Sequence, residues 1–222
     1  MRNLLIFDFD GTLIDTITDV GLCFNQALKQ CDFPQHPLEK FSDFAGGNLE
    51  TVVSKMLPQD RVTEENITAV KTRYREIYLK SEKKNTKPYP GIMDMLFVLK
   101  KQGYFLAVNS NKGQQLLDDM VGKMFEPDFF DAVVGYSEDR PSKPDAYGVE
   151  MICRECNCKL GQAIYVGDGK SDVMTAANAG IPCIYVQWGQ GKVSEWRDKY
   201  EAKIVNTVEE LRQILIGGEN IG

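Results

Sequence analysis

Short apolar segments recur at wide intervals along the chain, and each has the length of a buried strand. They cover residues 4–9, 104–109, 131–134, 163–166, 183–186 and 202–205. Several are rich in β-branched or aromatic residues and are bounded by glycine, aspartate or proline. Nearly continuous apolar runs of this kind are typical of strands that are covered on both faces, as in a parallel sheet.

Helical patterns lie between these segments. An apolar stripe with i, i+3, i+4, i+7 spacing follows Pro90-Gly91 and consists of Ile92, Met95, Leu96 and Leu99. Thr207 and Glu210 have the spacing of a capping box ahead of a second stripe, and the alanines before Gly180 predict a closely packed helix with a glycine C-cap. Strands that alternate with helices predict an α/β fold, a Rossmann-like doubly wound parallel sheet.

One connection breaks this alternation. Roughly ninety residues separate the first strand from Tyr104, and they carry helical patterns at about 16–31, 49–56 and 64–82 instead of strands. We therefore expect an α/β core formed by residues 1–15 and 88–222, with a helical cap formed by residues 16–87. An insertion at the carboxyl end of a strand lies where open α/β sheets bind their ligands, so the cap is expected to cover a site.

Composition narrows the class of protein. The 222 residues are 43% hydrophobic and 26% charged, with a formal net charge of -6. These values are typical of a globular protein and provide no basic surface for nucleic acid. No apolar run is long enough to span a bilayer, and the N-terminal residues do not form a secretory signal, so we expect a cytoplasmic protein with no membrane partner.

The six cysteines do not predict a disulfide framework in such a protein. Cys153, Cys156 and Cys158 are close together, but the chain has a single histidine and no second cysteine cluster to complete a zinc site. Partly buried helix cysteines are the favoured interpretation.

The first apolar segment ends in a pair of carboxylates, Asp8 and Asp10, followed by Gly11-Thr12. Side chains two apart on a strand point the same way, roughly 7 Å from each other. A hairpin turn is one explanation, since Asp-Gly between apolar runs is a strong turn signal. The other is catalysis, in which one carboxylate attacks, the other transfers protons, and both help to hold a cation.

Polar residues also follow the later strands. Ser110 and Asn111 come after residues 104–109, and Asp168 and Asp172 come after residues 163–166, with Lys143 in the segment ahead of the latter strand. All strands of a parallel sheet end at one edge, so these residues are expected to converge with the opening pair. Several carboxylates in one place need a cation, and an oxygen-only ligand set favours a hard ion such as Mg²⁺.

Together these motifs resemble those of the haloacid dehalogenase-like hydrolases. The resemblance rests on Asp8-x-Asp10-Gly11-Thr12, Ser110, Lys143 and Gly167-Asp168-x-x-x-Asp172 in order, and it spans the whole chain. The helical insertion is similar to the cap of the phosphoglycolate phosphatase-like branch.

The resemblance implies a role for each motif residue. Asp8 would be the nucleophile that forms an aspartyl-phosphate, and Asp10 would be the general acid and base. Ser110 and Lys143 would bind and neutralise the phosphoryl group, with Asn111 adding a contact. Mg²⁺ would be held by Asp8, the backbone carbonyl of Asp10, Asp168 and, as ligand or orienting residue, Asp172.

The cap is harder to interpret from sequence. The polar, glycine-bearing segment 42–48 is expected to reach the core site, with Asn48 or a neighbour touching the leaving group. An ordinary turn between two helices explains the same residues equally well.

The resemblance leaves several reactions to choose among. Asp10 argues against a dehalogenase, and Val20 stands where the related phosphomutases carry a histidine. The resulting hypothesis is a Mg²⁺-dependent phosphatase, monomeric or homodimeric, acting on a small phosphorylated metabolite, with phosphoglycolate as the leading candidate. An inorganic pyrophosphatase, a nucleotide phosphatase, a sugar phosphomutase and a non-catalytic binding protein remain alternatives.

Overall fold

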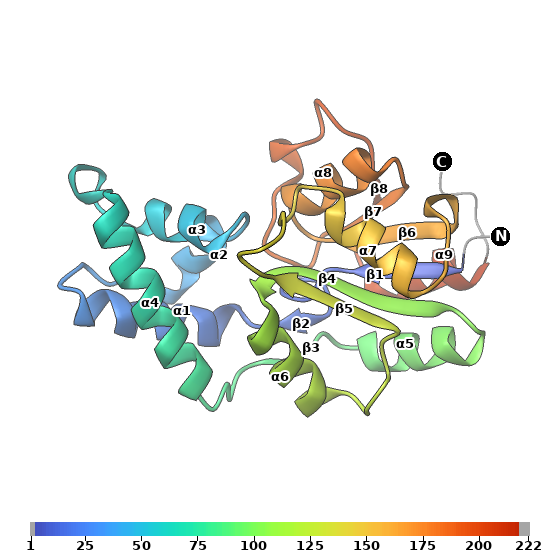
Figure 1. Cartoon of the computed structure of the whole chain (residues 1–222), viewed down its shortest axis with the longest axis horizontal. Coiled ribbons are helices and arrows are strands. Elements are labelled where there is room, and N and C mark those ends of the chain that lie inside the picture. The colour runs from blue at the N-terminus through green and yellow to red at the C-terminus, as the bar shows by residue number, and fades with distance from the viewer. Residues whose placement is uncertain (1–2, 218–222) are drawn as a thin grey trace.

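The computed structural model describes residues 3–217 and contains a six-stranded parallel sheet (Figure 1). The strand order is β5-β4-β1-β6-β7-β8. The strands are β1 (Leu4–Phe7), β4 (Phe105–Gly113), β5 (Ala132–Tyr136), β6 (Ala163–Gly167), β7 (Cys183–Val186) and β8 (Lys203–Val205). All six strands expected from the sequence are therefore present; β7 has the expected bounds, and the other five differ at one or both ends.

Strand β1 lies in the middle of the sheet because it has no polar face. Its four residues are fully buried, and it pairs in parallel with β4 on one side and β6 on the other. Leu5 and Phe7 join one hydrophobic cluster, while Leu4 and Ile6 join a second cluster across the sheet. This alternation gives the sheet two apolar faces, and each must be covered by helices.

Helices cover both faces, so the expected doubly wound α/β fold is confirmed. The first cluster includes side chains of α5 (Ile92–Lys101), α6 (Gln114–Met124) and α9 (Val208–Gly217). The second includes side chains of α7 (Tyr147–Glu155) and α8 (Lys170–Ala179). One of these helices, α6, has no counterpart among the elements expected from the sequence, whereas α7 carries Cys153, one of the cysteines expected on a helix. Short 3₁₀ turns also occur at Leu160–Gln162 and Val193–Glu195.

The predicted helix ends are largely confirmed. Gly180 ends α8 in the left-handed conformation, with φ of 65°. Thr207 accepts a hydrogen bond from the Glu210 backbone N–H, as a capping box requires. The reciprocal bond is displaced by one residue, because the Glu210 carboxylate accepts from the backbone of Asn206 instead of Thr207.

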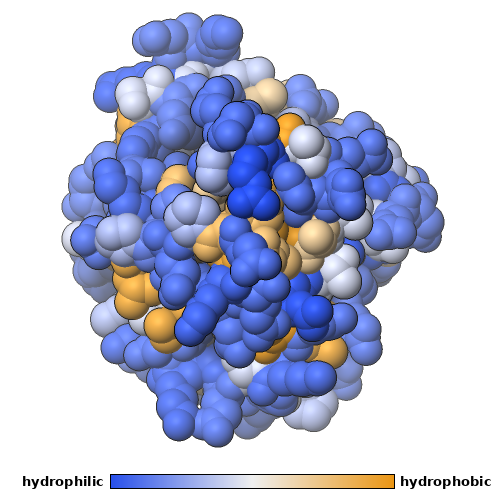
Figure 2. All heavy atoms as spheres, turned by 90° about the vertical axis from the view of Figure 1, so that its left-hand side faces the viewer, coloured by the Kyte–Doolittle hydropathy of each residue, from blue (hydrophilic) through white to orange (hydrophobic). Residues whose placement is uncertain are grey.

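The long connection after β1 forms a helical insertion, which lies beside the sheet at the left of Figure 1. It contains α1 (Ile17–Gln30), α2 (Phe41–Phe44), α3 (Leu49–Met56) and α4 (Glu64–Lys80), with 3₁₀ turns at Leu38–Lys40 and Gln59–Arg61. The stacked rings of Phe24 and Tyr74, whose centroids are 3.7 Å apart, join α1 to α4. Seen from this end, the surface is mainly hydrophilic, with small groups of apolar residues between polar ones (Figure 2).

The chain enters and leaves the helical insertion through a two-stranded antiparallel stem. Strand β2 (Ile14–Asp15) pairs with β3 (Lys87–Pro88), so the two linkers lie side by side. Asp19 of α1 strengthens this arrangement by accepting hydrogen bonds from the backbone and side chain of Asn85 and the hydroxyl of Thr86.

Among the described residues, none of the helices has the length and apolar content needed to cross a membrane. The cytoplasmic location stays a prediction.

Candidate active site

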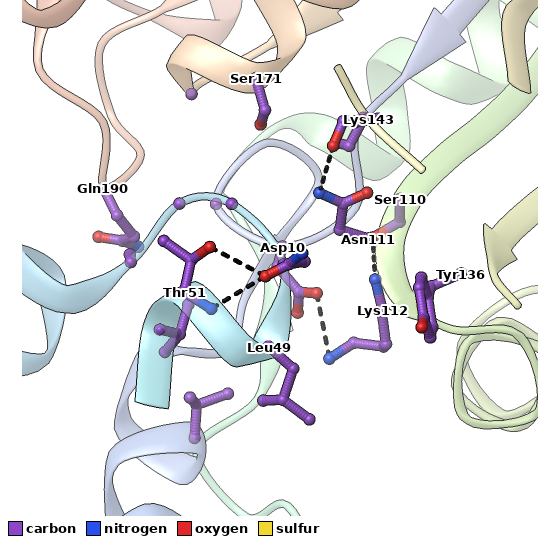
Figure 3. A pocket seen from close by; sticks show the side chains of 18 of the residues that line it. Asp10, Leu49, Thr51, Ser110, Asn111, Lys112, Tyr136, Lys143, Ser171 and Gln190 are labelled. Carbon is purple, nitrogen blue, oxygen red and sulfur yellow. Dashed lines mark hydrogen bonds and ion pairs between the residues drawn. The ribbon is translucent and has the colours of Figure 1, made fainter. Parts of the chain in front are cut away.

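The polar residues that follow β1, β4 and β6 converge at the carboxyl edge of the sheet. They line a cavity of about 990 Å³ between the core and the helical insertion. Figure 3 shows Asp10, Ser110, Asn111 and Lys143 around this cavity, with Thr51 and Leu49 approaching from the insertion. The structure thus brings together side chains that are far apart in the sequence.

The turn after β1 does not connect two hairpin strands. The hairpin interpretation of the Asp-Gly pair is wrong, because β1 pairs only with the parallel strands β4 and β6. Gly11 has φ of +84°, and a Cβ at this position would collide with the Asp168 carboxylate. The glycine therefore permits both the tight turn and the close approach of the loop that carries Asp168.

Three carboxylates form a buried group that we call the acidic triad: Asp8, Asp168 and Asp172. One oxygen from each lies within 4.8 Å of the others, and within residues 3–217 this is the only cluster of three or more His, Cys, Asp or Glu side chains close enough to share a metal ion. Burial and the charge of Asp172 raise the pKa of Asp8 well above its ordinary value. The same two causes raise the pKa of Asp168 to about 6.

The acidic triad fits a hard divalent cation. Its donors are all carboxylate oxygens, and their mutual repulsion in a buried place calls for positive charge. Asp168 is oriented by two hydrogen bonds, from the Thr12 hydroxyl at 3.1 Å and from the Gln190 backbone N–H at 2.7 Å. Such hydrogen bonds hold a ligand carboxylate in a fixed direction.

Lys143 supplies a positive charge within the triad. Its Nζ lies 2.7 Å from Asp8 and 2.6 Å from Asp172, and its side chain is buried. Burial alone would lower the pKa of Lys143, but the carboxylates of Asp172 and Asp8 raise it well above its ordinary value, so the lysine stays charged. The second oxygen of Asp172 accepts from the backbone N–H of Gly169 at 2.8 Å, which orients this carboxylate toward Lys143.

The Asp10 carboxylate is not part of the acidic triad. One of its oxygens accepts the Thr16 hydroxyl at 2.7 Å, and the other lies 3.0 Å from Nζ of Lys112 (Figure 3). Lys112 was not among the site residues predicted from the sequence. The available signal was its position directly after Ser110-Asn111, at the end of a strand that was expected to contribute to the site.

Ser110 and Asn111 lie beside Lys143 at the end of β4. The Ser110 Oγ accepts from the Lys112 backbone N–H at 3.2 Å, so the hydroxyl hydrogen can be donated elsewhere. The Asn111 amide donates to the Lys143 carbonyl at 3.2 Å. Its Oδ1 is buried and makes no hydrogen bond to any described residue, which leaves an acceptor available at the cavity wall.

Asn48 lies on the opposite wall of the cavity and also has a structural task. It is the N-cap of α3, and its Oδ1 accepts from both the backbone N–H and the hydroxyl of Thr51 at 2.9 Å. The interpretation as an ordinary interhelical turn therefore accounts for part of this segment. Contact between Asn48 and a leaving group stays a prediction.

The clustered cysteines lie in an apolar part of the protein. Cys153 and Cys156 are buried thiols packed in the second hydrophobic cluster, and burial raises the pKa of Cys156 to about 12. Neutral, buried thiols agree with the expectation that these cysteines are structural.

A doubly wound α/β core with carboxylates at its strand ends and a buried lysine beside them is the arrangement of a hydrolase of the haloacid dehalogenase class. Residues 5–186 match the family model described as haloacid dehalogenase-like hydrolase. The chain belongs to this family, in its phosphoglycolate phosphatase-like branch.

Curated relatives and solved structures agree with this assignment. The chain is 30% identical to a phosphoglycolate phosphatase of Aquifex aeolicus, over 86% of this chain and 87% of the relative. It is 26% identical to a phosphoglycolate phosphatase of Pseudomonas syringae pv. tomato, over 98% and 80%. A crystal structure from Lactobacillus delbrueckii subsp. bulgaricus superposes with a TM-score of 0.89 at 26% identity, covering 97% of this chain and 99% of that one.

A haloacid dehalogenase-like hydrolase from Streptococcus pneumoniae has the same fold. Its TM-score is 0.78 at 24% identity, over 95% of this chain and 97% of the other.

Proposed function

We propose that this chain is a Mg²⁺-dependent phosphomonoesterase that works through an aspartyl-phosphate on Asp8. The observation that carries the proposal is the acidic triad together with the buried Lys143, whose Nζ lies 2.7 Å from Asp8. A phosphoric monoester hydrolase is also the enzyme class that the family and the curated relatives support.

The proposed reaction has two steps. A carboxylate oxygen of Asp8 attacks the phosphorus, the bond from phosphorus to the leaving oxygen breaks, and Asp10 donates a proton to that oxygen. Water then attacks the phosphorus of the aspartyl-phosphate, Asp10 takes the proton of the water, and the Asp8 carboxylate and inorganic phosphate are released.

Other residues stabilise the phosphoryl group. The Ser110 hydroxyl is free to donate to one of its oxygens, the Lys143 ammonium neutralises its charge beside Asp8, and Asn111 adds a polar contact. Asp8, the backbone carbonyl of Asp10 and Asp168 would hold Mg²⁺, with Asp172 acting as ligand or as the group that orients Lys143. The ion would neutralise the triad and polarise a phosphoryl oxygen.

The substrate is proposed to be a small phosphorylated metabolite, and phosphoglycolate is the first candidate because the relatives carry that name. In this proposal residues 1–15 and 88–222 form the catalytic core and residues 16–87 form the cap. The cap faces the cavity with Asn48, which we propose touches the leaving group.

Turnover of p-nitrophenyl phosphate tests the chemistry. Asp8→Asn is expected to abolish turnover in Mg²⁺, and chelation with EDTA is expected to abolish it in the parent enzyme until Mg²⁺ is restored. Asp119→Asn, at an exposed position on α6, is the matched control and should be unaffected. Wild-type turnover by Asp8→Asn would refute the mechanism.

A panel of phosphorylated metabolites tests the substrate. Phosphoglycolate is expected to have the highest kcat/KM, and preference for pyrophosphate or a nucleotide would replace it as the assigned substrate.

Asn48→Ala tests the contact with the cap. It should raise KM for the preferred substrate more than for p-nitrophenyl phosphate. Asn48→Ser, which keeps a helix cap, should retain the stability but share the change in KM. Equal changes for both substrates would contradict the contact.

A further inference from the structure

Lys112 is a buried cation next to the proposed acid/base. It lies near the end of β4, its side chain is 6% exposed, and its Nζ is 3.0 Å from one oxygen of Asp10. Burial alone would lower the pKa of Lys112, but the Asp10 carboxylate raises it above its ordinary value. The lysine is therefore a charged partner that stays in place over the working range of most enzymes.

The two oxygens of Asp10 are held by two different parts of the chain. Lys112 of the core holds one, and the hydroxyl of Thr16, the residue that precedes α1, holds the other at 2.7 Å. A carboxyl group turns about two single bonds, and a partner on each oxygen restricts that rotation. Without Lys112, the Asp10 carboxylate would keep, among its partners in residues 3–217, only the hydrogen bond from Thr16.

The helical insertion reaches the same lysine. The Tyr78 ring of α4 is fully buried and its centroid lies 4.8 Å from the Lys112 Nζ, in the range of a cation–π contact. The Tyr78 hydroxyl donates a weak hydrogen bond to the sulfur of Met120 on α6, at 3.9 Å. Docking of α4 on the core therefore places an aromatic face beside the cation that holds Asp10.

We propose that Lys112 is a positioning residue for Asp10 and that Tyr78 makes this positioning depend on the docked helical insertion. The inference rests on the acid/base role proposed for Asp10. Its consequence is that proton donation to the leaving oxygen is efficient only when α4 is seated against the core. Phosphoryl transfer to Asp8 with a leaving group that needs no proton is much less dependent on Lys112.

Two matched aryl phosphates separate positioning from general damage. The p-nitrophenolate ion leaves without help, whereas phenolate, with a pKa of about 10 like tyrosine, benefits from a proton donor. Lys112→Met is expected to lower kcat/KM for phenyl phosphate by about tenfold more than for p-nitrophenyl phosphate. This is a small part of the 10²–10⁴-fold that a positioned acid typically contributes.

Variants of Tyr78 and Lys83 test whether the helical insertion acts on Asp10 through Lys112. Tyr78→Leu should change the ratio of kcat/KM for the two aryl phosphates in the same direction by a smaller factor. Tyr78→Phe keeps the ring but removes a hydroxyl that also interacts with Lys112, so it should change the ratio less than Tyr78→Leu. Lys83 contacts the same ring at 4.8 Å but has no contact with Asp10, so Lys83→Met is the matched control and should leave the ratio unchanged. Because Tyr78→Leu retains Lys112, its ratio of kcat/KM for the two aryl phosphates can be measured even if Lys112→Met folds poorly.

Asp10→Asn distinguishes the acid/base role of Asp10 from the positioning role of Lys112. It should shift the ratio strongly, and adding Lys112→Met to it should shift the ratio no further. An unchanged ratio in Asp10→Asn would refute the acid role itself. A shifted ratio in Asp10→Asn with none in Lys112→Met, or a further shift in the double variant, would refute only the role of Lys112. No effect of Tyr78→Leu would overturn the link to the insertion.

Discussion

Replacing Lys143 by methionine removes the cation that the structure places among three buried carboxylates. At 2.7 and 2.6 Å, with an effective dielectric constant of 20, each attraction is about 6 kcal/mol before desolvation is subtracted. Most of that is offset by the cost of burying the charges, and removing one partner of a buried pair typically costs about 3–5 kcal/mol. We expect Lys143→Met to lose that much unfolding free energy in urea without Mg²⁺.

The same substitution removes a donor beside the nucleophile. Loss of one preorganised donor to a developing anionic charge typically costs about 10²–10³-fold in kcat, and we expect a loss of this size on p-nitrophenyl phosphate with Mg²⁺. Steady-state turnover at saturating Mg²⁺ measures it, after circular dichroism has shown that the variant is folded under the assay conditions.

A double variant distinguishes charge imbalance from lost packing. Lys143→Met combined with Asp172→Asn removes the cation and one of its partners, so it should regain about 0.5–3 kcal/mol of stability over the single variant, while its turnover stays at or below that of the single variant. If the double variant is no more stable than Lys143→Met, the electrostatic account of the triad is wrong. Activity within threefold of the parent for Lys143→Met would refute its placement beside the phosphoryl group.

Further predictions concern the same loops. Because Asp168 has a folded-state pKa of about 6, above the ordinary 3.8, the folded metal-free protein binds more protons between these values. In EDTA, the Tm of the parent relative to that of Asp168→Asn should therefore fall as pH rises from 4 to 6, and a difference that rises over this range would contradict the shift. Gly11→Ala should reduce both Tm and turnover, because it combines a positive φ with a collision against Asp168. Gly103→Ala has the same φ of +84° in open space, so it should lower stability by about 1–2 kcal/mol and leave turnover intact.

The convergence of Asp8, Ser110 and Asp168 was predictable because these residues lie at the ends of neighbouring strands. Once β1, β4 and β6 are parallel neighbours, Asp8, Ser110 and Asp168 must meet at one edge, whatever the details of packing. The hydrophobic pattern was sufficient for those strands, since each is a buried apolar run. The same pattern missed α6, although Leu117 and Met120 bury one of its faces.

Contacts across the insertion could not be predicted in this way. The approach of Tyr78 to Lys112 depends on the angle at which α4 docks against the core, and no local spacing determines that angle. Likewise, whether Asn48 caps its own helix or points at a ligand depends on the rotamer of one side chain. Such features arise from tertiary packing between segments with independent sequence patterns.

The β2–β3 stem has a consequence for the history of the fold. Because Ile14 is paired with Pro88 and Asp15 with Lys87, the two points where the core chain is interrupted are strand neighbours. The core would need only a tight two-residue turn to close this gap. Any independently folding segment with adjacent ends can be accommodated there without moving β1 or β4. Exchange of one insertion for another could thus give a new substrate range in a single recombination event while the phosphate chemistry is inherited intact.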